Sequence, residues 1–105
     1  MSNLKKHPTL EDFQQYVREI VMERGFNDQS KIQKCLMLGE EVGELFKAVR
    51  KAENIKIDRN SDVGSVENEL SDVLIFILEI ANMYGIDLEK AFRAKEVINS
   101  KRVWK

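Results

Sequence analysis

Apolar side chains recur at helical spacing in four stretches of the chain, and no stretch alternates long enough to predict a sheet. Thr9, Ser65 and Asp87 each precede an apolar stretch and are suited to cap a helix. The predicted helices run approximately over residues 10–24, 31–52, 66–84 and 88–102. The pattern therefore predicts an all-α, four-helix bundle-like fold in a single domain over residues 1–105.

The helices predicted over residues 31–52 and 66–84 are separated by a polar segment, residues 53–64, which we expect to be an exposed loop. The helix over 66–84 is apolar around most of its circumference, so it is expected to be the central and most buried one. Three amphipathic partners in so small a chain cannot cover such a helix completely. We therefore expect the chain to associate with itself.

The charge balance argues against several function classes. The 105 residues carry a formal net charge of −1, which gives no reason to expect binding to nucleic acid or to an anionic membrane. The longest apolar run, near residues 73–78, is too short to span a bilayer, and the N-terminus lacks the apolar core of a signal peptide. Cys35 is the only cysteine, which fits a cytoplasmic location, and its place on an apolar face predicts a buried thiol.

Two short acidic clusters are the strongest chemical signal. Glu41 and Glu44 are three residues apart at the edge of the apolar face of one helix, while Glu40 points to the solvated side. Glu69 and Asp72 repeat this spacing among apolar neighbours on the next helix. A single such pair is most often a solvated face with local ion pairs, but two pairs facing apolar surroundings predict convergence on a hard cation such as Mg2+.

A cationic face on the last helix adds to this picture. Lys95, Asn99 and Arg102 follow an i, i+4, i+7 spacing, and their donors suit a phosphate chain. The alternative is an ordinary basic C-terminal turn that complements the helix dipole. Phe13, Tyr16, Phe26 and Trp104 are candidates to stack on a base, although Phe13 is better explained as a core residue.

The segment CLMLGEEVGEL at residues 35–45, followed by ELSDV at residues 69–73, resembles the EExxE…ExxD signature of the MazG-like nucleoside triphosphate pyrophosphohydrolases. This resemblance implies Mg2+-dependent cleavage between the α- and β-phosphates, with Mn2+ as a possible substitute, and a role in cleaning the nucleotide pool. It also implies that the self-association expected above gives a homodimer or homotetramer. By position, it implies metal ligation by Glu41, Glu44, Glu69 and Asp72. It also implies water orientation by Glu40 or Glu41, and substrate contacts by Lys95, Asn99 and Arg102.

The sequence is compatible with two other functions. One is a phosphoribosyl-ATP pyrophosphohydrolase-like enzyme of the same superfamily, and the other is a non-catalytic helical oligomerisation module. A di-iron carboxylate bundle is disfavoured, because no histidine lies on a predicted helix.

Overall fold

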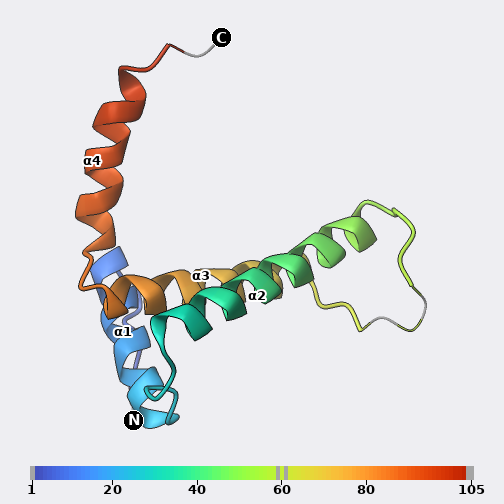
Figure 1. Ribbon diagram of the computed structural model, residues 1–105, viewed down its shortest axis with the longest axis horizontal. Coiled ribbons are helices and arrows are strands. Elements are labelled where there is room, and N and C mark those ends of the chain that lie inside the picture. The colour runs from blue at the N-terminus through green and yellow to red at the C-terminus, as the bar shows by residue number, and fades with distance from the viewer. Residues whose placement is uncertain (1, 59, 61, 104–105) are drawn as a thin grey trace.

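The computed structural model describes residues 2–58, 60 and 62–103, so Trp104 lies outside the described residues. In this part of the chain there are four helices and no strand, which confirms the all-α prediction (Figure 1). The helices are α1 Leu10–Glu23, α2 Lys31–Ala52, α3 Val66–Met83 and α4 Leu88–Ser100. No helix among the described residues is long and apolar enough to cross a membrane.

Local capping explains where the helices begin and end. The Thr9 hydroxyl accepts the Asp12 N–H, and the Asp12 carboxylate accepts the Thr9 N–H, which together form a capping box at α1. Ser30 and Gln33 form the same reciprocal pair at α2. The Ser65 and Asp87 side chains cap α3 and α4 as predicted.

The first three helices pack together, whereas the fourth projects away from them. The helices α2 and α3 lie side by side and antiparallel, α1 packs on α3, and α4 leaves the hairpin near the start of α1 (Figure 1). The radius of gyration is 16.4 Å, against about 13 Å expected for a compact chain of this length. A single copy of the chain is therefore not a closed bundle.

The buried apolar residues are consequently few. They are Val17, Ile20, Ala48, Leu78 and Ala81. The prediction that α3 is the central helix is confirmed, because both α1 and α2 pack on it. They cover only part of its circumference, so apolar surface is left over in the single chain, as expected. On its open side, Leu70, Leu74 and Ile77 are 51%, 42% and 39% exposed. The prediction of a buried Cys35 is wrong, since this thiol is exposed on α2.

A buried glutamine joins three of the helices. The Gln14 side-chain amide on α1 donates to the Asn82 side chain at 3.1 Å and to the Ile86 carbonyl at 2.8 Å. Its Oε1 accepts the backbone N–H of Leu88, the first residue of α4, at 3.0 Å. The Asn82 amide in turn donates to the Gln14 carbonyl. Gln14 therefore anchors the start of α4 to both α1 and the end of α3.

Candidate metal centre

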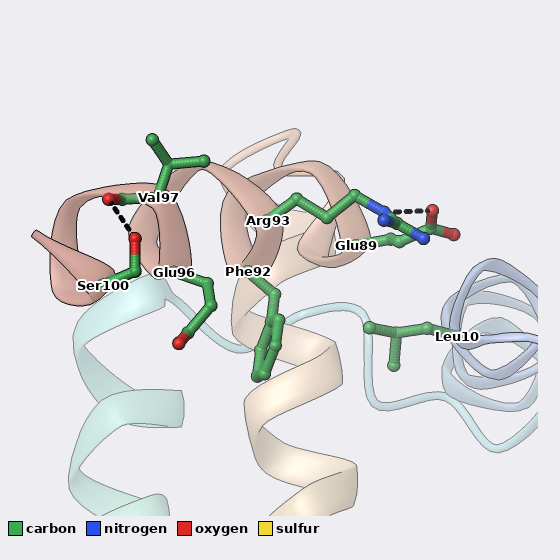
Figure 2. A pocket seen from close by; sticks show the side chains of 7 residues that line it. All are labelled: Leu10, Glu89, Phe92, Arg93, Glu96, Val97 and Ser100. Carbon is green, nitrogen blue, oxygen red and sulfur yellow. Dashed lines mark hydrogen bonds and ion pairs between the residues drawn. The ribbon is translucent and has the colours of Figure 1, made fainter.

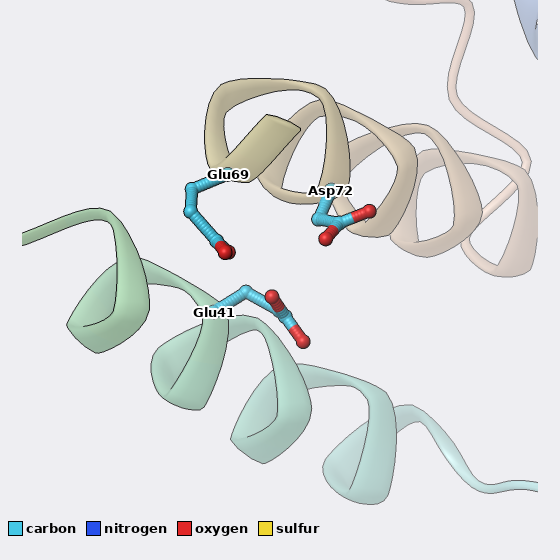
Figure 3. Close-up of side chains that lie close together, drawn as sticks. All are labelled: Glu41, Glu69 and Asp72. Atoms are coloured by element: carbon cyan, nitrogen blue, oxygen red, sulfur yellow. The ribbon is translucent and has the colours of Figure 1, made fainter. Parts of the chain in front are cut away.

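Three carboxylates from two helices meet across the α2–α3 hairpin. Glu41 of α2, Glu69 of α3 and Asp72 of α3 each place a carboxylate oxygen within 4.8 Å of the others (Figure 3). Glu69 and Asp72 are three residues apart, so they project from one side of α3 toward Glu41. Glu41 and Glu69 are half-buried, and Asp72 is exposed. One acid of the first cluster therefore meets both acids of the second.

The electrostatics of this group favour a bound cation. Burial raises the pKa of Glu41, and repulsion from Asp72, Glu69 and Glu44 raises this pKa further. Within the described residues, no lysine or arginine forms an ion pair with Glu41, Glu69 or Asp72. Since carboxylate oxygens are the ligands that Mg2+ and Mn2+ prefer, the donor set fits a hard divalent cation.

The other two acids of the first cluster lie outside this group. The Glu44 Oε1 is 3.8 Å from the Lys47 Nζ, one turn further along α2, and the Glu44 side chain is 42% exposed. Glu40 is exposed on α2. Glu44 contributes to the raised pKa of Glu41, so it lies close enough to the group to act on it electrostatically.

The predicted phosphate-binding residues lie on the projecting helix or directly after it. Lys95 and Asn99 belong to α4, and Arg102 follows its last residue. The Asn99 Oδ1 is buried, with no hydrogen-bond partner among the described residues. Because α4 packs against α1 and leaves the hairpin, the single chain does not bring these side chains to the carboxylates (Figure 1).

A glycine in the loop before α3 makes room for one of the carboxylates. A Cβ atom built on Gly64 would overlap the Glu69 Oε1. No local pattern in the sequence marks Gly64, because its role depends on the path of the loop. The absence of a side chain at this position lets Glu69 take the place it has in the group.

A wide hollow lies away from the carboxylates. It has a volume of about 670 Å3, and Phe92 of α4 and Leu10 of α1 face it (Figure 2). The Arg93 Nε and the Glu89 Oε2 form an ion pair at its rim, 3.0 Å apart. This hollow is mainly apolar and holds none of the five predicted acids.

The fold and the site together define an all-α protein with a carboxylate cluster between two antiparallel helices. Residues 29–100 match the family described as the MazG nucleotide pyrophosphohydrolase domain. The chain belongs to this family of hydrolases that act on phosphoric anhydrides.

Curated relatives agree with this assignment. The uncharacterized protein YvdC of Bacillus subtilis is 32% identical over 101 residues, covering 89% of this chain and 94% of YvdC. The dATP/dGTP diphosphohydrolase of Cyanophage S-2L is 40% identical over 65 residues, which cover 62% of this chain and half of the phage protein.

Solved structures extend the similarity to the fold. The Cyanophage S-2L MazG-like pyrophosphohydrolase, bound to dGDP and three catalytic Mn2+ ions per active site, has a TM-score of 0.70 and 30% identity. That match covers 96% of this chain and 87% of the phage chain. The iMazG protein from Vibrio DAT 722 has a TM-score of 0.64 and 33% identity, covering 89% of this chain and 99% of iMazG.

Proposed function

We propose that the chain hydrolyses a nucleoside or deoxynucleoside triphosphate at the α–β phosphoanhydride, releasing a nucleoside monophosphate and pyrophosphate. Mg2+ is the proposed working cation, with Mn2+ as a substitute, and the proposed role is removal of unwanted nucleotides in the cytoplasm. The observation that carries this proposal is the meeting of Glu41, Glu69 and Asp72 within 4.8 Å without a cationic partner among the described residues.

The charge of the site accounts for the class of substrate. A triphosphate carries several negative charges, which carboxylates alone would repel. When bound, divalent cations neutralise both sets of charge and stabilise the charge that develops on the attacked phosphoryl group and on the leaving pyrophosphate. Glu41, Glu69 and Asp72 are the proposed ligands, with Glu44 as a fourth after it leaves Lys47.

The remaining acid has a different proposed role. Glu40 adjoins the ligand Glu41 but is exposed, so it is free to accept a hydrogen bond from a water molecule. In this role it holds the attacking water in line with the phosphorus and takes its proton. Glu41 can share this task if coordination leaves one of its two carboxylate oxygens for the water.

The proposed working form is a homodimer or homotetramer. The open side of α3 and the projecting α4 expose large apolar side chains, including Leu70 at 51% and Phe92 at 70%. Packing of a second copy against them would remove this surface from water. In such an assembly Lys95, Asn99 and Arg102 would contact the triphosphate bound by another copy. Lys95 and Arg102 would then supply the positively charged side chains that the carboxylate group of a single chain lacks.

A direct assay tests the proposal. The full chain is incubated with Mg2+ and each of a panel of ribo- and deoxynucleoside triphosphates, and the products are separated by chromatography. The expected products are a monophosphate and pyrophosphate in equal amounts. Release of orthophosphate and a diphosphate would instead show cleavage at the β–γ bond and overturn the proposal, as would failure to hydrolyse any member of the panel with Mg2+ or Mn2+.

A further inference from the structure

A buried ion pair lies two helical turns along the hairpin from the carboxylates. The Lys34 Nζ on α2 is 3.1 Å from the Glu79 Oε1 on α3, and these side chains are only 4% and 6% exposed. Lys34 precedes Glu41 by seven residues, and Glu79 follows Asp72 by seven. Seven residues make nearly two helical turns and rise about 10 Å. Lys34 and Glu79 therefore lie on the same helix faces as the carboxylates, about 10 Å further along the hairpin.

The hydrogen bonding of this ion pair is incomplete. The Glu79 Oε2 is buried, and it has no hydrogen-bond partner within the described part of the chain. The Lys34 ammonium has three donors, of which one is directed at Glu79. A buried ion pair offsets the cost of desolvation only when its remaining donors and acceptors are satisfied. The Glu79 Oε2 acceptor and the remaining N–H donors of Lys34 therefore lie side by side and are available to a ligand.

These unused groups face a cavity that reaches the metal centre. Its volume is about 270 Å3, and its lining includes Lys34 and Glu79 as well as Asp72. The rings of Phe26 and Phe76 also line it, and each ring centroid is 5.7 Å from the Lys34 Nζ. Pockets for whole drug-sized ligands begin at about 300 Å3, so this cavity suits a single flat ring system.

We propose that this cavity holds the base of the nucleotide substrate, and that Lys34 and Glu79 select guanine by its hydrogen-bonding edge. The inference rests on the proposed function, since it assigns the base end of a nucleotide whose phosphates lie at Glu41 and Asp72. Phe26 and Phe76 provide aromatic faces on which the base stacks. The two-turn separation matches the reach of a nucleotide from its α-phosphate to the far edge of its base.

Guanine satisfies the pair more fully than the other bases do. Its O6 accepts a charged hydrogen bond from Lys34, a pairing that also serves in reading guanine in DNA. Its N1–H and N2–H2 groups donate to the Glu79 carboxylate, whose Oε2 has no partner among the described residues. Adenine and thymine each offer the carboxylate one donor group on this edge, and hypoxanthine lacks the 2-amino group. Guanine alone offers the pair one acceptor and two donor groups on this edge, so the expected preference is guanine above hypoxanthine, adenine and thymine.

The experiment compares kcat/KM for dGTP, dITP, dATP and dTTP in the wild-type chain and in Glu79→Gln and Lys34→Met. We expect dGTP to be preferred over dATP by at least about tenfold, and each substitution to lower this ratio by at least about tenfold. Inhibition by tripolyphosphate, which has no base, should keep its wild-type constant. Glu89→Gln, which breaks the exposed Arg93 ion pair, is the matched control and should retain the wild-type ratios.

Two results would overturn the inference. One is an unchanged dGTP-to-dATP ratio in both variants. The other is an equal loss for all four nucleotides together with a matching loss of tripolyphosphate inhibition, which would assign the ion pair a structural role alone. If a single variant does not fold, the doubly substituted Lys34→Met, Glu79→Leu chain removes both charges at once. Its failure to fold as well would equally assign the pair to stability.

Failure of the proposed function gives a different result. In that case the wild-type chain hydrolyses no nucleotide, but binding of dGTP and dATP with Mn2+ can still be compared by calorimetry. A guanine preference in binding that Glu79→Gln removes would support the base site without the hydrolysis. Equal affinities for the two nucleotides would overturn the base site by itself.

Discussion

At the scale of single residues, the metal centre is a place where like charges are held together against their repulsion. Glu41 shows this most clearly, because both burial and its acidic neighbours raise its pKa. The protein does not relieve the repulsion with a cationic side chain among the described residues. The three carboxylates should therefore oppose folding in the absence of a metal ion and support it when one is bound.

Removing one ligand tests the centre directly. In Asp72→Asn we expect kcat/KM for triphosphate hydrolysis to fall by about 100-fold or more, because a neutral amide replaces a charged ligand. The helix content measured by circular dichroism should stay the same, since Asp72 is exposed. Glu67→Gln, at another exposed acid of α3, is the control and should keep wild-type activity. Wild-type turnover in Asp72→Asn would remove Asp72 from the centre.

A second prediction concerns Glu41 and pH. A carboxyl group whose pKa is raised by folding costs no stability below its ordinary pKa. Its cost grows as the pH rises from the ordinary to the raised pKa and is fully present above that. Metal-free Glu41→Gln should therefore melt at a higher temperature than the wild type at pH 7, and this difference should vanish in acid. The same variant should lose most of the Mn2+-induced rise in Tm. If the Tm difference between Glu41→Gln and the wild type grew toward low pH, repulsion between Glu41 and its acidic neighbours would not be its cause.

At the scale of helices and loops, the chain's local chemistry made the boundaries predictable. Capping depends on residues within one turn, so Thr9, Ser65 and Asp87 identified helix starts from sequence alone. Burial was less predictable, because it depends on which neighbour covers each face. The sequence pattern indicated that part of α3 would stay uncovered but not which part, and the open side proves to carry Leu70, which is 51% exposed in the single chain.

In the candidate site, too, local features were predictable and long-range contacts were not. The i, i+3 spacing of Glu69 and Asp72 predicted that they share a side of α3, and the hairpin brings Glu41 to them. The ion pair of Lys34 with Glu79 was missed, because it joins residues 45 positions apart that belong to no local motif. Cys35 was expected to be buried because it lies on an apolar stripe, but this thiol is exposed in the single chain.

The loop before α3 gives a prediction at this scale. In Gly64→Ala the new methyl group would occupy the place of the Glu69 carboxylate and force this flexible side chain aside. We expect the apparent affinity for Mn2+, measured by calorimetry, to fall by about tenfold while the Tm of the metal-free chain changes little. Gly39→Ala is the control, because a Cβ at Gly39 meets nothing within 4 Å. Equal Mn2+ affinities in the two variants would show that Gly64 does not position Glu69.

At the scale of the whole molecule, the open arrangement of α4 is the dominant feature. This helix exposes Phe92 at 70%, Val97 at 56% and Ile98 at 55%, an unusual amount of apolar surface for a helix of 13 residues. The proposed assembly would bury this surface and bring α4 to another copy of the metal centre. Activity and assembly should then depend on each other.

Placing a charge on that surface tests this dependence. In Phe92→Glu we expect a smaller particle in sedimentation velocity at micromolar concentration, and a loss of hydrolysis of at least about tenfold. Lys90→Glu introduces the same side chain at an exposed polar position of α4 and should leave the particle size unchanged. A wild-type chain that sediments as a fully active monomer would contradict the proposed assembly.

The hydrogen bonds of Gln14 also bear on the order of events during synthesis. They connect this residue to Asn82, Ile86 and Leu88, which follow it by 68, 72 and 74 positions. A nascent chain leaves the ribosome N-terminus first, so the amide emerges long before any of these partners is translated. Docking of the last helix must therefore wait until nearly all of the polypeptide has been made, and premature termination anywhere upstream of Ile86 would leave that amide without the helix it holds.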